Sequence, residues 1–441
     1  MTIHPITTFQ GELRGPSDKS LTHRSYMFAA IAHGSSVVRH PLRGEDCEST
    51  LRCMNQLGLS YEWLGADEVR LTPPEQWSQP YDVLDCGNSG TTIRLLSGLI
   101  ASRPIECTLA GDASLSKRPM KRIGVPLRLM GAVVEGDTPP LRIKGGKLHG
   151  IHYESPVASA QVKSCCLLAG LGASGSTTVT EPSLSRDHTE RMLRAMGAHL
   201  IRSGDEHVND ASDSNVHHRS HMRPSVTVHQ TSRLNPFEFS VPADISSAAF
   251  FIVAAAILPQ SRLLLRDLNV NPTRTGIFDV LEQCRIPFEF GEYRSELGEP
   301  VADVSIGWTS SLQPFTIEGS LVPRLIDEIP VLAVLATQCD GVSVIRDAGE
   351  MRIKESDRIE LMASGLRRMG AQVETFEDGM AISGPTALKG DRIDACLDHR
   401  IAMAFAIAGL VADGATTIDG AEAIVTSYPN FETDLMELSV V

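Results

Sequence analysis

The sequence predicts an α/β protein in which one structural unit is repeated six times, in two domains of three units each. Three observations support this prediction. A polar helix start, an apolar helix and a β-rich run recur six times, and an amphipathic second helix follows each copy. A polar stretch then interrupts the series after the third copy. Successive copies lie about 65 to 90 residues apart, a period typical of a repeated supersecondary unit.

The first copy begins within residues 14–34 and carries an unusual distribution of charge. Ser17 and Asp18 are suited to cap a helix, and an apolar run follows them. Lys19 and Arg24 lie in the first turns, where cations oppose the helix macrodipole. A bound anion would satisfy the free N–H groups, the dipole and both cations together. We therefore predict a site for a phosphate or a carboxylate at this helix start.

The remaining copies repeat the same order of elements. Five more apolar helices with polar starts are predicted within residues 87–111, 159–182, 242–268, 324–348 and 398–421. The second helices end at 51–58, 127–132, 193–198, 280–286 and 366–371, with 431–441 as a shortened sixth. Most of these endings combine apolar residues three apart with a basic residue and a terminal glycine, which favours an amphipathic helix with a glycine C-cap. A strand-like run follows most of them.

Residues 201–223 break the period with serine, asparagine and aspartate. The chain resumes with an alternating run at 225–229, and we expect it to cross between the two domains where the fourth unit starts at Pro242. Four histidines there, His207, His217, His218 and His221, could ligate a metal, but a solvated loop is the favoured interpretation.

Composition limits the classes of partner. The 441 residues are 42% hydrophobic, and 40 basic against 54 acidic residues give a formal net charge of −14, which argues against a general nucleic-acid binder.

The nine cysteines form no C-x-x-C motif and fit reduced thiols in a cytosol. The start of the chain does not resemble a signal peptide, and the most apolar run, residues 247–258, is too short to span a bilayer. We expect a cytoplasmic protein without membrane contact.

Several further helix starts carry groups suited to anions. Residues 87–94 form a glycine-bearing turn with hydroxyl, amide and guanidinium groups, a weak phosphate-loop signal when taken alone. Residues 114–122 contain four cations; such a run is usually a solvated face, but Arg118 beside Pro119 suits bidentate binding of a carboxylate or phosphate. Within residues 185–191, Arg186 could face a ligand, although a capping box with ion pairs explains the segment equally well.

The later copies add carboxylates. Asp327 and Glu328 precede an apolar helix, and residues 350–358 contain six charges. Either segment could form surface salt bridges, but a carboxylate among several cations can also act as a base or an acid. Arg400 at the last apolar helix repeats the arrangement seen at Lys19.

Motifs for other chemistries do not occur. The sequence has no G-x-x-x-x-G-K-[ST], G-x-G-x-x-G, H-E-x-x-H or G-x-S-x-G. Nucleotide-binding, nicotinamide-dependent, zinc-protease and serine-hydrolase functions lose support.

Taken together, these segments resemble the 5-enolpyruvylshikimate-3-phosphate synthase family, the 3-phosphoshikimate 1-carboxyvinyltransferases. The resemblance covers nearly the whole chain, in the order SDKSLTHR, GNSGTTIR, KRPMKR, SAQVKS, SRDHTERM, LIDE, RIKESDR and DHRIAMA. It implies two inside-out α/β domains, each of three βαβαββ units, with the active site in the interdomain cleft. The implied domains are residues 18–242, binding mainly shikimate 3-phosphate, and residues 1–17 plus 243–441, carrying catalytic carboxylates and arginines for phosphoenolpyruvate.

The resemblance also implies a reaction and roles for individual residues. The enolpyruvyl group of phosphoenolpyruvate passes to the 5-hydroxyl of shikimate 3-phosphate, phosphate is released, and no metal or organic cofactor is needed. Asp327 is implied as the base, Glu355 as the group that handles the proton at the methylene carbon, and Lys19 as a third catalytic residue. The residues implied for shikimate 3-phosphate are Lys19, Ser20, Arg24, Ser159, Ala160, Gln161, Arg186, Asp327 and Lys354. Those implied for phosphoenolpyruvate are Lys19, Asn88, Gly90, Arg118, Gln161, Arg358 and Arg400.

Three positions qualify the resemblance. Glu350 and Thr426 depart from the branch of the family that writes GSKS, so no contact is carried over to either. Gly90 leaves room that an alanine would remove, which predicts inhibition by glyphosate, a competitor at the phosphoenolpyruvate site. A monomer is expected.

Two alternatives stay open at this point. UDP-N-acetylglucosamine enolpyruvyl transferase shares the six-unit fold but uses a loop cysteine before an arginine, and residues 115–118 offer none. The other alternative is a repeat protein that binds anions without catalysis, which would leave Asp327 and Glu355 without a role.

Overall fold

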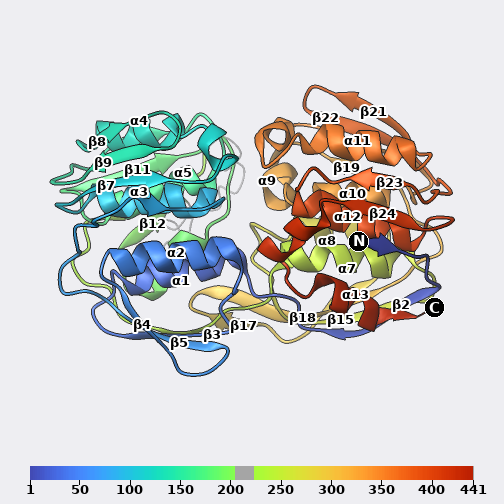
Figure 1. The fold of residues 1–441 in the computed structure, drawn as a ribbon, viewed down its shortest axis with the longest axis horizontal. Helices are drawn as coiled ribbons and strands as arrows, with labels where there is room; N and C mark the ends of the chain where they lie inside the picture. The colour runs from blue at the N-terminus through green and yellow to red at the C-terminus, as the bar shows by residue number, and fades with distance from the viewer. Residues whose placement is uncertain (204–222, 441) are drawn as a thin grey trace, which may run out of the picture. The chain divides into compact units, whose positions relative to one another are not determined.

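The chain forms two compact units in a computed structural model that describes residues 1–203 and 223–440 (Figure 1). Unit 1 comprises Met1–Asp18, Pro242–Ser295 and Pro300–Val441, and unit 2 comprises Lys19–Val241 and Glu296–Glu299. The four histidines considered as metal ligands, His207, His217, His218 and His221, lie outside the described residues.

Six apolar helices form the centres of the two units, as the sequence predicts. In unit 2 they are α1 (Lys19–Ala29), α3 (Gly90–Ala101) and α5 (Ala160–Gly170), and in unit 1 they are α7 (Ile245–Ile257), α10 (Ile329–Ala336) and α12 (His399–Leu410). Every residue of α7 and α10 is buried. Apolar residues, mainly alanine, valine, isoleucine and leucine, occupy all faces of both helices, as expected for helices in a core. None of the six has an acidic residue in its first turn.

A second, amphipathic helix follows each central helix. These are α2 (Glu45–Gln56), α4 (Lys121–Leu129), α6 (His188–Ala195), α8 (Gly276–Gln283), α11 (Arg358–Arg368) and α13 (Phe431–Leu438). Gly58, Gly131, Gly197 and Gly370 follow four of them with φ between 93 and 109°, so the predicted glycine C-caps are present. The fourth copy lacks that glycine, and Arg285 takes the left-handed conformation instead, with φ of 61°.

Unit 2 contains three four-stranded sheets of one design. Each contains a parallel pair of strands followed by two antiparallel strands, and in two of the three sheets a central helix joins the parallel pair, as in the order β6, α3, β7, α4, β8, β9. The first sheet takes one edge strand from the end of the unit, where β14 pairs with β3 in parallel. The strands are β3 (Ser36–Arg39), β4 (Ser60–Trp63), β5 (Glu68–Thr72), β6 (Leu84–Asp85), β7 (Glu106–Ala110), β8 (Val133–Glu135), β9 (Leu141–Lys144), β10 (His152–Glu154), β11 (Ser176–Thr180), β12 (Leu200–Arg202), β13 (Ser225–His229) and β14 (Glu238–Ser240).

Unit 1 repeats this design with help from the start of the chain. β2 pairs in parallel with β15, and β1 pairs with β24, so the N-terminal strands complete two sheets whose other strands come from residues after 261. The strands are β1 (Thr2–Ile3), β2 (Thr8–Leu13), β15 (Arg262–Asn269), β16 (Phe288–Phe290), β17 (Arg294–Glu296), β18 (Glu299–Gly307), β19 (Thr316–Ile317), β20 (Gly341–Ile345), β21 (Gln372–Phe376), β22 (Gly379–Gly384), β23 (Arg392–Asp394), β24 (Thr416–Asp419) and β25 (Ser439–Val440). A short helix, α9 (Val322–Leu325), precedes α10. The predicted α/β fold of βαβαββ units is confirmed.

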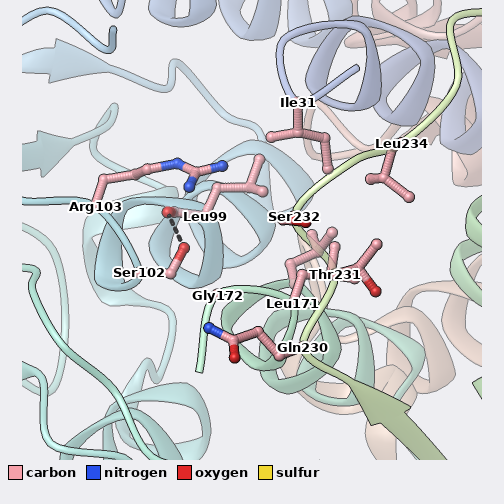
Figure 2. Close-up of a pocket in the computed structure, with 11 residues that line it drawn as sticks. Ile31, Leu99, Ser102, Arg103, Leu171, Gly172, Gln230, Thr231, Ser232 and Leu234 are labelled. Atoms are coloured by element: carbon pink, nitrogen blue, oxygen red, sulfur yellow. Dashed lines mark hydrogen bonds between the residues drawn. The ribbon is translucent and has the colours of Figure 1, made fainter. Parts of the chain in front are cut away.

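Three further features bear on function. The C-terminal ends of α1, α3 and α5 surround a cavity in unit 2 (Figure 2). All nine cysteines are free, and eight of them are buried. Within the described ranges, no helix combines the length and the apolar character that a membrane crossing requires.

Candidate active site

Arg24 in unit 2 is held by hydroxyl and carbonyl oxygens from three helices. Its Nε donates to Thr189 Oγ1 of α6 at 2.9 Å, and its Nη2 donates to Ser164 Oγ of α5 at 3.1 Å. Its Nη1 donates to the main-chain oxygen of Ser20 at 2.9 Å. These contacts fix a guanidinium that is only 3% exposed, next to the start of α1. Such a preset cation suits an anionic ligand, since little side-chain freedom is left to lose on binding.

A second group of side chains joins α3, α5 and the 3-10 turn Leu115–Lys117. The guanidinium of Arg118 donates to the amide oxygen of Asn88. Arg94 Nη1 donates to Gln161 Oε1 at 2.6 Å. A Cβ built on Gly90 would lie 2.6 Å from Arg94 Nη1 and 3.3 Å from Arg118 Nη1, so Gly90 brings both guanidinium groups against its backbone. An alanine at this position would therefore take space beside these two side-chain ends that glycine leaves open.

Neutral side chains cap these helices. Ser89 Oγ accepts from Thr92 N at 3.1 Å, and Ser159 Oγ accepts from Val162 N at 3.4 Å. The α3 cap is held by a buried chain of contacts in which His23 Nδ1 lies 2.6 Å from Thr50 Oγ1, and Thr50 Oγ1 lies 2.6 Å from Thr92 Oγ1. Burial lowers the pKa of His23 to about 3, so this histidine is neutral at pH 7.

The other predicted residues of unit 2 occupy nearby helix starts or loops. Lys19 begins α1 and forms an ion pair of 2.5 Å with Asp46 of α2. Ala160 is the first residue of α5. Arg186 is half-buried in the loop between β11 and α6. In the same loop Asp187 pairs with Arg191 at 2.8 Å, so the ion pairing that competed with a ligand role for this segment is present.

A buried triad supports the loop that carries Arg186. Lys163 Nζ lies 2.8 Å from Glu181 and 2.9 Å from Glu190, all three side chains being at most 3% exposed. The same ammonium donates to the main-chain oxygen of Ser185, and Ser185 Oγ donates to Glu181. Burial lowers the pKa of Lys163, but Glu190 and Glu181 outweigh it and the net pKa is raised. The charged lysine therefore fixes the backbone directly before Arg186.

Unit 1 gathers its predicted residues around Asp327. Asp327 Oδ1 lies 3.8 Å from Lys354 Nζ and 3.7 Å from Arg358 Nη1. Arg400 Nη1 donates to the main-chain oxygen of Asp327 at 3.2 Å. The Asp327 side chain is 15% exposed, so the carboxylate is partly accessible beside these two cations.

Arg358 is the central cation of this group. Its Nη2 lies 2.7 Å from Glu355, and its Nε lies 2.8 Å from Asp398, which caps α12. Burial lowers the pKa of Arg358, but Asp398, Glu355 and Asp327 outweigh it and raise the net pKa. The arginine remains charged although it is 1% exposed, and it orders Asp327 and Glu355 on either side of one guanidinium.

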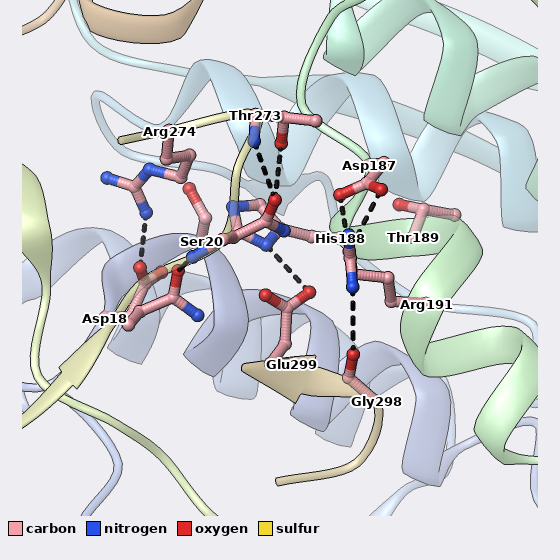
Figure 3. Close-up of polar contacts among 12 residues, drawn as sticks. Asp18, Ser20, Asp187, His188, Thr189, Arg191, Thr273, Arg274, Gly298 and Glu299 are labelled. Atoms are coloured by element: carbon pink, nitrogen blue, oxygen red, sulfur yellow. Dashed lines mark hydrogen bonds and ion pairs between the residues drawn. The ribbon is translucent and has the colours of Figure 1, made fainter. Parts of the chain in front are cut away.

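Related buried networks hold the segments where the chain passes from one unit to the other (Figure 3). In unit 1, Arg274 forms ion pairs with Asp18 and with Asp244, the cap of α7. In unit 2, His188 Nδ1 lies 2.9 Å from Glu299, which belongs to the inserted segment Glu296–Glu299. The expected domain boundaries did not include this insertion.

No group of three or more His, Cys, Asp and Glu side chains in the described part of the chain is arranged to hold a metal ion. The side chains around Arg24, Gly90 and Asp327 carry guanidinium, ammonium, carboxylate, amide and hydroxyl groups. Such groups bind anions and move protons.

Sequence reasoning missed two supporting residues and gave a third no contact. The guanidinium of Arg94 belongs to the predicted helix start at 87–94, but its contact with Gln161 was not predicted. Ser164 and Thr189 hold Arg24 from two other helices, and no local pattern indicates such a contact.

Known proteins are similar to this chain over nearly its whole length. The sequence matches the family model for EPSP synthase (3-phosphoshikimate 1-carboxyvinyltransferase) over residues 3–435. The 3-phosphoshikimate 1-carboxyvinyltransferases of Bacillus cereus strain AH187 and Bacillus thuringiensis strain Al Hakam are each 46% identical, with 99% of both chains covered.

Solved structures of enolpyruvyl transferases are also similar to this chain. An EPSP synthase from Acinetobacter baumannii is 41% identical with a TM-score of 0.85, covering 100% of this chain and 98% of that chain. The enolpyruvyl transferase NikO from Streptomyces tendae is 17% identical with a TM-score of 0.78, covering 99% and 96%, and shows the shared fold alone. The chain belongs to the EPSP synthase (3-phosphoshikimate 1-carboxyvinyltransferase) family.

Proposed function

We propose that this protein transfers the enolpyruvyl group of phosphoenolpyruvate to the 5-hydroxyl of shikimate 3-phosphate, giving 5-enolpyruvylshikimate 3-phosphate and phosphate. The observation that carries this proposal is the group around Asp327, where one carboxylate lies 3.8 and 3.7 Å from two cations and Glu355 binds the same arginine. Two carboxylates ordered by one buried guanidinium suit a reaction that needs two proton transfers. Family membership supplies the substrate pair.

The anionic groups of the substrates have candidate partners in both units. We assign shikimate 3-phosphate to the side chains and helix starts Lys19, Ser20, Arg24, Ser159, Ala160, Gln161, Arg186, Asp327 and Lys354. We assign phosphoenolpyruvate to Lys19, Asn88, Gly90, Arg118, Gln161, Arg358 and Arg400. The buried, preset guanidinium of Arg24 and the cations adjoining Gly90 support these assignments because phosphate and carboxylate groups bind best to ordered donors.

The proposed chemistry proceeds by addition and elimination. Asp327 accepts the proton of the 5-hydroxyl as that oxygen bonds to the central carbon of phosphoenolpyruvate, and Glu355 delivers a proton to the methylene carbon, which becomes a methyl group. Glu355, deprotonated by the addition step, then takes a proton back from this methyl group, and the bond between the central carbon and the phosphate oxygen breaks. Inorganic phosphate leaves and the vinyl double bond is restored. Lys19 and the arginines stabilise the charge on the departing phosphate.

We further propose a cytoplasmic monomer that glyphosate inhibits in competition with phosphoenolpyruvate. Nine free cysteines, eight of them buried, support a reducing compartment. The cations that we assign to phosphoenolpyruvate suit the carboxylate and phosphonate of glyphosate equally well. Gel filtration with light scattering tests the oligomeric state, and inhibition at micromolar glyphosate tests the competition.

Phosphate release tests the function itself. Shikimate 3-phosphate and phosphoenolpyruvate should together give rapid release, and each alone should give none. UDP-N-acetylglucosamine with phosphoenolpyruvate should also give none, because residues 115–118 lack the cysteine that the related transferase uses. Turnover with the nucleotide sugar, or none with either pair, would overturn the proposal.

A further inference from the structure

A cavity of about 330 Å³ lies at the C-terminal ends of the three central helices of unit 2 (Figure 2). Its apolar wall consists of Ile31, Leu99, Leu168, Leu171 and Leu234. The residues of these three helices that we assign to the substrates, such as Lys19, Gly90 and Ala160, lie toward the opposite, N-terminal ends. A helix of 11 or 12 residues is about 17 Å long, so an occupant of this cavity would not share the substrate contacts.

Arg103, directly after α3, is the cation of this cavity, and Figure 2 shows its guanidinium turned toward Leu99 and Ile31. Its Nε is buried and makes no hydrogen bond within residues 1–203 and 223–440. No carboxylate among those residues pairs with it, and its neighbour is the ring of Trp77 at 5.3 Å. Arg103 is half-buried, and burial lowers the pKa of its guanidinium. A partly desolvated guanidinium with no carboxylate partner among the described residues is suited to pair with an anionic ligand.

Capping of the helix C-terminus does not account for this arginine. The Leu99 carbonyl accepts from Ser102 Oγ at 3.0 Å, and the Ala101 carbonyl accepts from Gly146 N at 3.0 Å. On the facing segment, the Leu171 carbonyl accepts from Thr231 N at 3.0 Å. Because these carbonyls already have donors, the guanidinium is not needed to satisfy them.

We propose that this cavity binds a small carboxylate with an apolar body. The carboxylate pairs with the Arg103 guanidinium, and the apolar body packs against Leu99, Leu168 and Leu171. A cavity of about 150 Å³ holds benzene, so about 330 Å³ has room for a ring of that size with a short carboxylate arm. The leucine wall disfavours inorganic phosphate, which has no apolar surface to bury.

Calorimetric titration of the full-length protein with 3-phenylpropanoate tests the proposal, with neutral 3-phenylpropanamide as the matched probe. We expect submillimolar binding of the carboxylate and at least tenfold weaker binding of the amide. Arg103→Met should reduce carboxylate affinity at least tenfold, and Leu168→Trp should abolish binding by filling the cavity. Equal affinity for both probes, or unchanged affinity in Arg103→Met, would overturn the proposal.

Two controls distinguish binding in this cavity from binding among the substrate groups and from a purely structural role of Arg103. Arg118→Met removes a cation assigned to phosphoenolpyruvate and should leave 3-phenylpropanoate affinity unchanged; a loss there would place the probe among the substrate groups and contradict the proposal. The melting temperature of Arg103→Met should not fall, because Arg103 is half-buried and makes no ion pair among the described residues. A fall of several degrees would make Arg103 a structural residue and would also contradict the proposal.

Discussion

The caps of the central helices differ between the two units. In unit 2, Ser89 and Ser159 cap α3 and α5 with neutral hydroxyls. In unit 1, Asp244 and Asp398 cap α7 and α12 with carboxylates. A hydroxyl satisfies one N–H group but leaves the positive end of the macrodipole available to an external anion, whereas a carboxylate neutralises it. The starts of α3 and α5 therefore remain available to an external anion, whereas the starts of α7 and α12 already carry a counter-charge.

Each aspartate cap is tied to a buried arginine. Asp244 lies 2.7 Å from Arg274, and Asp398 lies 2.8 Å from Arg358. Burial raises the pKa of each carboxyl, but the guanidinium outweighs it and the net pKa lies below the ordinary value. Unit 1 therefore supplies its own counter-charges and uses them to order Arg358 beside Asp327. Two starts of central helices in unit 2 thus carry neutral caps, whereas the carboxylate caps of unit 1 are already paired with arginines.

The largest expected effect removes the proton acceptor from unit 1. Asp327→Asn should lower kcat by about 10³-fold, because general-base catalysis contributes about 10²- to 10⁴-fold. Substrate affinities should change much less, since the amide preserves the shape of the side chain. Phosphate release under saturating substrates measures the effect. Glu374→Gln on exposed β21 is the matched control and should retain full activity; equal rates for both variants would remove Asp327 from the chemistry.

The next effect concerns the charged caps. Asp398→Asn should lower the free energy of unfolding by about 3 kcal/mol at pH 7, because Arg358 stays buried with less negative charge around it. A depressed pKa stabilises the fold above the unfolded value of about 3.9 and loses that contribution as the pH falls through the folded value. The difference between wild type and variant should therefore shrink in acid. Urea unfolding of both proteins at pH 7 and at acid pH measures this difference in the free energy of unfolding.

Asp391→Asn is the matched control for the buried cap. Asp391 pairs with Arg368 at 3.2 Å on the surface, where the two side chains are 36% and 57% exposed. Exposed pairs contribute little, so this variant should unfold almost as the wild type does. If both variants lost equal stability, the distinction between the aspartate caps and ordinary surface pairs would fail.

The sequence predicted the local features well because they are written in contiguous residues. Central helices and glycine C-caps follow from periodicity and turn chemistry, whereas the roles of Asp327, Lys354 and Arg358 were implied only by the family resemblance. Contacts between distant segments were not predictable in the same way. The pairing of β2 with β15 and the placement of Glu296–Glu299 in unit 2 depend on tertiary register, which no short window of sequence contains.

A smaller effect would give unit 2 the kind of cap found in unit 1. Ser159→Asp keeps a good cap for α5, so stability should change little, but its charge should repel shikimate 3-phosphate. We expect a rise in KM of about 10-fold, which corresponds to two charges about 10 Å apart at an effective dielectric constant near 20. Added salt should reduce the effect. Ser159→Asn provides the neutral cap of similar size, and a similar rise in KM for that variant would exclude repulsion as the cause.

The smallest expected effect concerns the cations beside Gly90. A methyl group there would meet Arg94 Nη1 at 2.6 Å and Arg118 Nη1 at 3.3 Å, so both guanidinium ends must shift. Flexible side-chain ends move at low cost, and we expect Gly90→Ala to raise the KM for phosphoenolpyruvate about fivefold, or about 1 kcal/mol of overpacking. Glyphosate inhibition should weaken at least as much, because the same cations would hold that anion. Steady-state kinetics with varied phosphoenolpyruvate and glyphosate measure both effects. Gly146→Ala, where the added carbon meets no atom within 4 Å, is the control. Unaltered inhibition in Gly90→Ala would show that Arg94 and Arg118 do not hold this class of anion.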